Sequence, residues 1–397
     1  GFTYDIFGDK SLKVRGGTGL FAGRLPLVYM TNMPSNAAMF QHLSVMTTNY
    51  NSDGTIAARN PNLDAFAASA NGGKFPTATA DILAKLNSLD PANNPIDITP
   101  KDGALQSTVN GVDPNFKMPQ VWKSSLALDM RLPTSFPFTM MAEGTFNKTI
   151  NGTLITNWNN TDNTTWPQMS GPDNRHVYGS YSNYTKYPTY VLTNTNKGYG
   201  WIFVLSASAE PVKNLKINAS YTHTEQYEVT GMPGNNAESV FTGLPTVDGP
   251  NFAVLHGSQY VRPDRLMANV SYRLRTGTTL SVFYQGYTPT GNSYIYSNDV
   301  NGDGVKQDLI YIPATKDEVL WTSSAEADKF WKFLEQDSYL SSHKGQYAEA
   351  YAVHAPMVHY VDLRATQDFK IRIGKSVNTL QLSCDLMNVG NLLNNSW

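Results

Sequence analysis

The feature that most constrains this chain is the alternation of apolar and polar residues in its last hairpin, residues 361–387. On the first limb, apolar side chains occupy every second position from Val361 to Ile373, and only Gln367 departs from the pattern. A turn then leads to a second limb with the same period, from Leu380 to Leu386. Since successive side chains of a strand point to opposite faces, each limb has one apolar face and one polar face.

The same alternation recurs upstream, where it predicts four more pairs of strands. Short turns join the strands within a pair, and connections of roughly thirty to a hundred residues join successive pairs. The predicted strands cover residues 2–7, 12–21, 122–132, 138–147, 201–209, 215–222, 266–275, 280–286, 361–373 and 380–387. Most of these segments are close in length to the 9–11 residues that a tilted strand needs to cross a bilayer.

The placement of the long connections predicts the fold class. Every long connection leaves the strands at the same end, and outer-membrane barrels have short periplasmic turns and long extracellular loops. The sequence therefore predicts an all-β fold, an antiparallel transmembrane β-barrel with long, partly helical extracellular loops, in the cell outer membrane. Helices are expected at Ser35–Val45, Asn62–Ala70 and Thr79–Leu89, and after a capping-box pattern at Ser323–Glu326.

Composition and motifs exclude several other classes. The net charge is -2, so the chain has no overall excess of the basic residues that nucleic-acid binding uses. A single cysteine, Cys384, excludes an internal disulfide framework, and no apolar run is long enough for a transmembrane helix. His354 and His359 lack the partners of a zinc site, and the charged residues of the last hairpin fit a polar barrel interior better than a catalytic centre. No catalytic residue is predicted, and the protein is not expected to be an enzyme.

The sharpest local motif runs from Asp299 to Asp308. Oxygen-bearing side chains stand at its first, third and fifth positions and a glycine at its sixth, as in the first half of an EF-hand calcium loop. Because a hard cation binds several oxygens, this spacing predicts a structural calcium ion. Its predicted ligands are Asp299, Asn301, Asp303, the carbonyl group of Val305, and Asp308. Ile310 replaces the glutamate expected at the twelfth position, so an Asx-rich turn next to a strand is the alternative.

Four segments resemble the C-terminal barrel of TonB-dependent outer-membrane receptors, specifically the Oar-like branch of Bacteroidota-type bacteria. They follow the family's order along the chain and are Val14–Arg24, Asp113–Lys123, Asn298–Pro313 and Asp385–Trp397. Members of this family are similar in having a barrel of about 22 strands with a plug domain inside it.

The resemblance implies that residues 1–397 are part of a single outer-membrane β-barrel domain, its C-terminal portion. The plug and the final strand are then expected in sequence outside this chain, since ten strands cannot close so large a barrel. The implied partners are outer-membrane lipid, the remaining strands and plug of the parent protein, the TonB complex acting through that plug, and a surface lipoprotein or extracellular ligand.

The leading functional interpretation is a TonB-dependent receptor or transporter. Its extracellular loops would capture an unidentified substrate, and energy-coupled movement of the plug would allow uptake. One alternative is an outer-membrane barrel for adhesion, surface display or envelope integrity without import. A second alternative is a soluble all-β protein that binds or hydrolyses carbohydrate, which extraction without detergent would favour.

Overall fold

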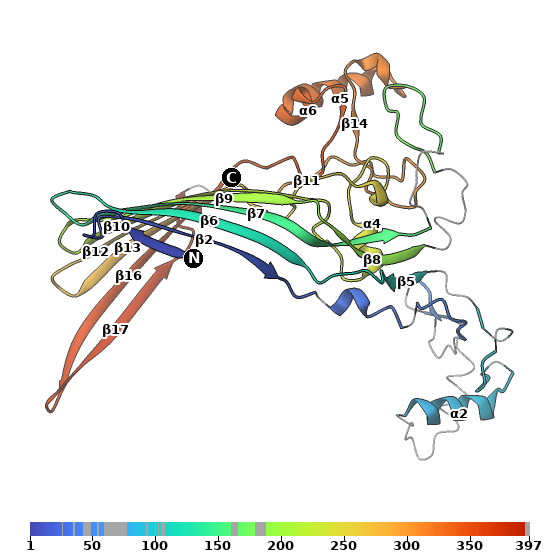
Figure 1. The fold of residues 1–397 in the computed structure, drawn as a ribbon, viewed down its shortest axis with the longest axis horizontal. Coiled ribbons are helices and arrows are strands. Elements are labelled where there is room, and N and C mark those ends of the chain that lie inside the picture. The colour runs from blue at the N-terminus through green and yellow to red at the C-terminus, as the bar shows by residue number, and fades with distance from the viewer. Residues whose placement is uncertain are drawn as a thin grey trace.

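The computed structural model describes residues 1–25, 27–34, 36–42, 49–53, 55–58, 78–92, 94–99, 101, 103–104, 108–159, 166–178 and 188–393. Ten long strands form one antiparallel ladder through these residues (Figure 1). In sheet order they are β1 (Phe2–Asp5), β2 (Leu12–Ala22), β6 (Gln120–Arg131), β7 (Phe138–Asn157), β9 (Tyr199–Val212), β10 (Leu215–Glu228), β12 (Asp264–Arg273), β13 (Thr278–Tyr287), β16 (Val358–Ile373) and β17 (Ser376–Leu386).

This ladder confirms the predicted antiparallel all-β fold class. Each of the ten predicted strands is present. The ten strands lie in the ladder in the order in which they occur in the sequence, and each is hydrogen-bonded to the next. Three short strands extend the ladder into a 13-stranded sheet: β5 (Val109–Val112), β8 (Thr189–Thr195) and β11 (His256–Gly257). Among the described residues, no helix is both long enough and apolar enough to cross a membrane.

The register of the ladder keeps apolar and polar side chains on opposite faces. One row across the sheet contains Leu12, Met130, Met140, Ala207, Ala219, Ala268, Tyr284 and Val361. The adjacent row, on the other face, contains Lys13, Asp129, Met141, Ser206, Ser220, Met267, Gln285 and Tyr360. Because a slip of one residue would exchange the two faces of a strand, these rows show that the eight strands from β2 to β16 are in the same register with respect to the two faces of the sheet.

The apolar face is exposed. Leu126 is 56% exposed, Leu280 is 49% exposed and Leu382 is 57% exposed. The buried apolar clusters that the structure describes lie in the connections and at the loop ends of the strands, away from this face. The face therefore finds no cover within the described parts of the chain.

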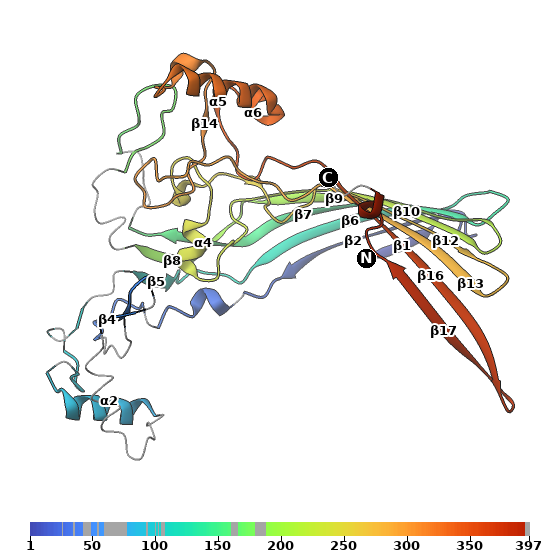
Figure 2. The ribbon, with the colours of Figure 1, turned by 180° about the vertical axis from the view of Figure 1, so that it is seen from behind.

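The long connections gather at one end of the sheet and the short turns at the other, as Figures 1 and 2 show from opposite sides. These connections contain short helices and strands. They are η1 (Leu27–Met30), β3 (Asn49–Tyr50), β4 (Ile56–Ala58), α2 (Thr79–Leu89), α4 (Ala237–Thr242), η3 (Pro250–Phe252), β14 (Tyr311–Ile312), η4 (Lys316–Glu318), α5 (Ser324–Gln336), α6 (Ser338–Ser342) and β15 (Gln346–Tyr347). A last short helix, α7 (Gly390–Leu393), follows β17.

The predicted loop helices have mixed outcomes. Helix α2 has the predicted bounds, and α5 begins after Ser323, whose hydroxyl accepts a hydrogen bond from the Glu326 amide. The helix predicted at Ser35–Val45 is wrong where the structure describes it, over 36–42. There Gln41 pairs with Ala104 as a β-bridge, so a contact distant in sequence overrides the local pattern. Residues 43–45 and the helix predicted at Asn62–Ala70 lie outside the described residues.

Strand β7 runs ten residues beyond its predicted end, to Asn157. Up to Lys148 it pairs with β9, and from Gly152 onward it pairs with β8 instead. The extension therefore leaves the ladder and enters the connections. The sequence pattern does not predict this extension, because its threonines and asparagines do not alternate with apolar residues as the earlier part of the strand does.

Candidate functional site

The four long connections pack together around one apolar cluster. Its buried members are Leu25, Tyr29, Ile155, Tyr190, Leu192, Ala237, Val240, Phe241 and Val305. Residues from all four connections contribute to it, and strand β7 reaches into it through Ile155. We call the described residues of these connections the loop body. It is a folded unit rather than a set of separate loops, so groups far apart in sequence hold fixed positions in it.

The predicted calcium motif lies inside this loop body. Both carboxylate oxygens of Asp299 accept backbone hydrogen bonds, from Gly302 at 2.7 Å and Gly304 at 2.9 Å. The Asn301 side chain accepts a bond from the Asp303 amide, and Asp303 accepts one from the Val305 amide. Gly304, the sixth position of the motif, has a φ of 85°. These are the bonds of successive Asx turns, which was the alternative interpretation.

The predicted ligands are close in sequence, but their roles in the structure differ. Asp308 accepts a hydrogen bond from the Val300 amide at 2.7 Å and lies 3.7 Å from a guanidinium nitrogen of Arg175. Val305 packs in the apolar cluster. Within the described residues, no three acidic, histidine or cysteine side chains converge as a metal site requires. Asx turns use the same oxygens that an ion would bind, and calcium at this motif stays a prediction.

Asp303 has the most strongly raised pKa among the carboxyl groups of the motif. It is 5% exposed, and burial, together with the charges of Asp308 and Asp299, raises its pKa to about 7. Its neighbour Gly249 has a φ of 89°, and a β-carbon there would lie 2.7 Å from a carboxylate oxygen of Asp303. The glycine therefore lets a second connection close over the motif.

The raised pKa of Asp303 predicts a pH-dependent stability. In the unfolded chain this carboxyl ionises near its ordinary value of 3.8, but in the folded chain it keeps its proton up to about pH 7. The free energy of unfolding therefore falls as pH rises from about 4 to about 7, and then becomes level. We expect a loss of about 2 kcal/mol, half of the ~4 kcal/mol that the shift represents, because relaxation and entering water reduce the penalty.

Replacing Asp303 by Asn tests both this slope and the ion. We expect Asp303→Asn to remove the part of the pH dependence that Asp303 contributes in calcium-free buffer, and to leave the smaller part that comes from the buried Asp308, whose pKa is also raised. Asp317→Asn, at an exposed position, should leave the pH dependence unchanged. If the motif binds Ca²⁺, millimolar Ca²⁺ raises the melting temperature of the wild-type protein and not of Asp303→Asn. If the motif is only an Asx turn, Ca²⁺ changes neither. Thermal unfolding at several pH values, with Ca²⁺ or EGTA, provides the measurement, and a flat wild-type profile would contradict the prediction.

Arg175 joins two of the long connections of the loop body. Its side chain is fully buried and donates to Asp173 at 2.9 Å and to the carbonyl oxygen of Leu309 at 2.7 Å. The guanidinium also stacks on the rings of Tyr296 and Tyr347, at 5.2 and 5.5 Å. Sequence reasoning missed this residue because an isolated arginine in a polar connection carries no local signal.

A cavity of about 570 Å³ lies where the loop body meets the ends of the strands. The end of β10 forms one wall, through residues 223–227. The connection from β10 to β12 contributes residues 245–248 and 252–263 with gaps, and the stretch before β16 contributes 347–352 and His354. This volume is within the range of small-molecule sites. The cavity could not be predicted from local sequence patterns, because three distant segments form it.

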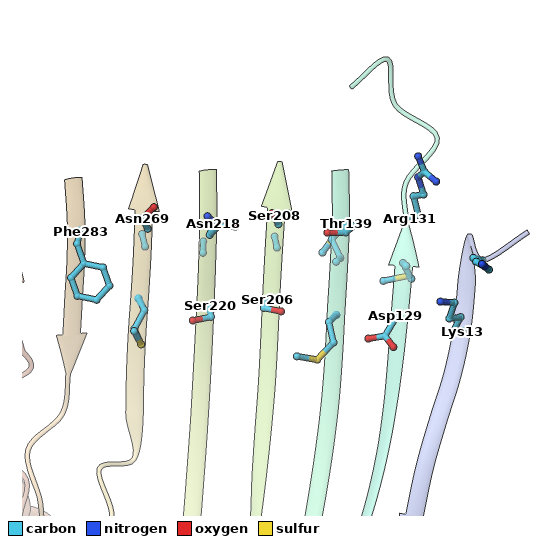
Figure 3. A pocket seen from close by; sticks show the side chains of 18 residues that line it. Lys13, Asp129, Arg131, Thr139, Ser206, Ser208, Asn218, Ser220, Asn269 and Phe283 are labelled. Carbon is cyan, nitrogen blue, oxygen red and sulfur yellow. The ribbon is translucent and has the colours of Figure 1, made fainter. Parts of the chain in front are cut away.

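A second hollow, of about 510 Å³, lies on the polar face of the sheet near the short turns (Figure 3). Small side chains, Ser206, Ser208 and Ser220, form its floor, and the charged groups of Lys13 and Asp129 lie at one side (Figure 3). An open wall of this kind has many polar groups but no enclosed ligand site. It offers a surface for a large partner rather than for a small molecule.

The other residues considered from the sequence lie apart from the cavity, or only at its edge. The Nδ1 of His359 is 2.7 Å from the hydroxyl of Tyr284. His354 reaches the cavity wall and its Nδ1 lies 3.0 Å from the carbonyl oxygen of Pro289. Cys384 is exposed on the apolar face, in the row of Ala365.

Known proteins provide little further guidance. No family model matches the chain, and no curated protein matches it. Among solved structures, the outer membrane transporter YddB from Escherichia coli is similar at a TM-score of 0.43 and 10% sequence identity. The match covers 98% of this chain but only 36% of that one, so this chain spans about a third of its length. So low a TM-score carries no argument, and the proposal below rests on the two faces of the sheet.

Proposed function

We propose that this chain is part of an outer-membrane barrel that acts as a TonB-dependent receptor or transporter. In this proposal the apolar face contacts lipid, the polar face lines a wet interior, and the loop body captures an extracellular ligand. Uptake would then be coupled to energy through a plug domain. The domain assignment, one barrel domain of which residues 1–397 are a portion, belongs to the same proposal.

The observation that carries the proposal is the continuous exposed apolar face. Soluble proteins rarely expose an apolar patch larger than a few hundred Å². Here the apolar rows cross all ten strands of the ladder. Hydrocarbon would remove the cost of exposing these side chains to water, and this weighs against the soluble carbohydrate-binding alternative.

Charged groups on the polar face are paired, as expected for a wet interior. Arg15 forms ion pairs with Asp129 at 3.1 Å and with Glu143 at 2.8 Å. Near the other edge, Arg273 pairs with Asp368 at 2.8 Å. These exposed pairs add little stability. Their value here is that they mark a hydrated surface, which could not face lipid tails.

The two edges of the ladder support the proposed partners. Strand β1 pairs only with β2, and β17 pairs only with β16, within the described residues. Unpaired strand edges are not tolerated in lipid, because each unsatisfied backbone group costs several kcal/mol. We therefore propose that further strands complete the barrel, and that the open polar hollow of Figure 3 faces a plug.

Cys384 allows the lipid-facing assignment to be tested at one position. We expect a nitroxide attached to Cys384, in protein reconstituted into vesicles, to collide more with O₂, which partitions into lipid, than with a water-soluble nickel complex. The matched control moves the thiol by one residue, as Ser383→Cys in a Cys384→Ser background, and should show the reverse preference. Equal accessibility at the two positions, or a preference of Cys384 for the nickel complex, would refute the membrane assignment.

The dependence of uptake on the proton-motive force distinguishes a TonB-dependent receptor from an adhesion or display barrel. A TonB-dependent transporter loses uptake when a protonophore collapses the proton-motive force, while ligand binding at the surface continues. An adhesion or display barrel shows surface binding with no uptake to lose.

A further inference from the structure

We propose that the 570 Å³ cavity binds an organic cation, an ammonium or guanidinium group carried on an apolar body. The inference rests on the proposed receptor function, because capture by the loop body would bring such a molecule to the cavity. It adds the chemical class of the ligand, which neither the sequence nor the fold specifies.

The charges around the cavity favour a cation. Glu225, Asp248 and Glu349 line it, each from a different segment of the chain. No lysine or arginine lines it among the residues that the structure describes. An anionic ligand would therefore meet repulsion, whereas a cation would meet complementary charge, and such complementarity mainly determines specificity.

Two of the three carboxylates already have partners. A carboxylate oxygen of Glu225 lies 3.3 Å from Nε2 of His223, and Asp248 accepts a hydrogen bond from the His176 amide at 2.9 Å. The carboxylate of Glu349 makes no hydrogen bond or ion pair with any described residue, although its backbone amide donates to Tyr339. Glu349 is therefore the carboxylate most available to a ligand, and the other two add to the negative potential.

The rest of the wall suits an apolar body. Three tyrosines, Tyr227, Tyr347 and Tyr351, line the cavity together with Leu255 and the buried alanines at 348 and 350. Aromatic faces attract cations as well as apolar groups. A ligand with a positive end near Glu349 and an apolar body among these side chains would satisfy both parts of the wall.

Contacts of His256 position one part of the cavity wall. Both ring nitrogens of His256 face carbonyl oxygens, of Gly257 at 2.8 Å and Val229 at 3.0 Å, and its ring lies 5.3 Å from that of Tyr351. Burial raises the pKa of Tyr351 to about 12, so its phenol remains a neutral hydrogen-bonding group. Rigid walls reduce the ordering cost of binding.

The test uses the purified protein in detergent, two dipeptide probes and isothermal titration calorimetry. N-acetyl-phenylalanyl-arginine amide carries a guanidinium as its only charge, and N-acetyl-phenylalanyl-citrulline amide replaces it with a neutral urea of nearly the same shape. We expect the arginine probe to bind at least about tenfold more tightly, a factor that corresponds to about 1.4 kcal/mol. Equal affinity of the two probes, or no binding of the arginine probe, would overturn the inference.

Variants locate the site. Glu349→Gln should weaken binding of the arginine probe by about tenfold, on the scale of one charged hydrogen bond. It should leave the citrulline probe unaffected. The matched control is Glu335→Gln, the same substitution at an exposed position of α5 outside the cavity, which should leave both affinities unchanged. Equal effects of the two variants would place the probe elsewhere and refute the assignment.

The outcomes distinguish this inference from the proposed function. Calorimetry in detergent needs neither a bilayer nor uptake, so binding of the arginine probe with a failed lipid-accessibility test would keep the cation site and remove the membrane proposal. A correct lipid-accessibility result without probe binding would keep the barrel and remove the cation site.

Discussion

Leu205→Arg is expected to destabilise the protein in a bilayer by about 2–4 kcal/mol, the range for a basic residue at mid-depth on a lipid-facing strand. Leu205 lies near the middle of β9, is 37% exposed, and has Ala142 and Tyr221 as its neighbours across the sheet. An arginine at this position must either place its guanidinium in hydrocarbon or reach for the interface. In water the same substitution at an exposed position would cost little.

The matched control is the next residue. Ser206 lies on the polar face, where Figure 3 shows it in the row of Ser220 and Asp129. We expect Ser206→Arg to change stability by less than about 0.5 kcal/mol, as is usual for a solvated position. Urea unfolding of both variants in lipid vesicles measures the difference. A larger loss for Ser206→Arg than for Leu205→Arg would mean that the two faces have been assigned the wrong way round.

The strands could be predicted from the sequence because their signal is local. Alternation with a period of two, as from Val361 to Ile373, is a property of neighbouring residues and survives whatever the rest of the chain does. Pairing within each hairpin followed from the short turns, since a turn of a few residues leaves two strands little choice but to pair. Pairing between hairpins, such as β2 with β6, spans a long connection and has no such local signal. The end of β7 at Asn157 could not be predicted, because only its partner β8 makes that segment a strand.

The candidate site could not be predicted, because it depends on contacts between distant segments. Val305 and Leu25 share one apolar cluster, although they are far apart in the sequence and neither belongs to a periodic pattern. Glu349 faces the cavity from a stretch that reads as ordinary polar loop. The motif at 299–308 could be found because its oxygen-bearing side chains are close in sequence, but its burial depends on Gly249 and Arg175, in other connections.

Arg175→Met is expected to destabilise the loop body by about 3–5 kcal/mol, the cost of removing one partner from a buried ion pair. Methionine fills much of the same volume but leaves the carboxylates of Asp173 and Asp308 without their cation. The Leu309 carbonyl also loses its donor, at 2.7 Å. Because these groups belong to two of the long connections, we expect the connections to separate together rather than one at a time.

The strands of the ladder should be spared, since the contacts of Arg175 with described residues are all within the connections. Hydrogen exchange in detergent measures this difference directly. Amides of Leu192 and Val240, in the apolar cluster, should exchange faster in Arg175→Met, while amides of β9 and β12 keep their protection. Arg262→Met is the control, because Arg262 stacks on Tyr287 at an exposed position, where a cation–π contact is worth only about 0.5–1 kcal/mol. If Arg175→Met left the cluster as well protected as Arg262→Met does, the loop body would be held by its apolar contacts alone. The cavity would then keep its shape without the buried guanidinium.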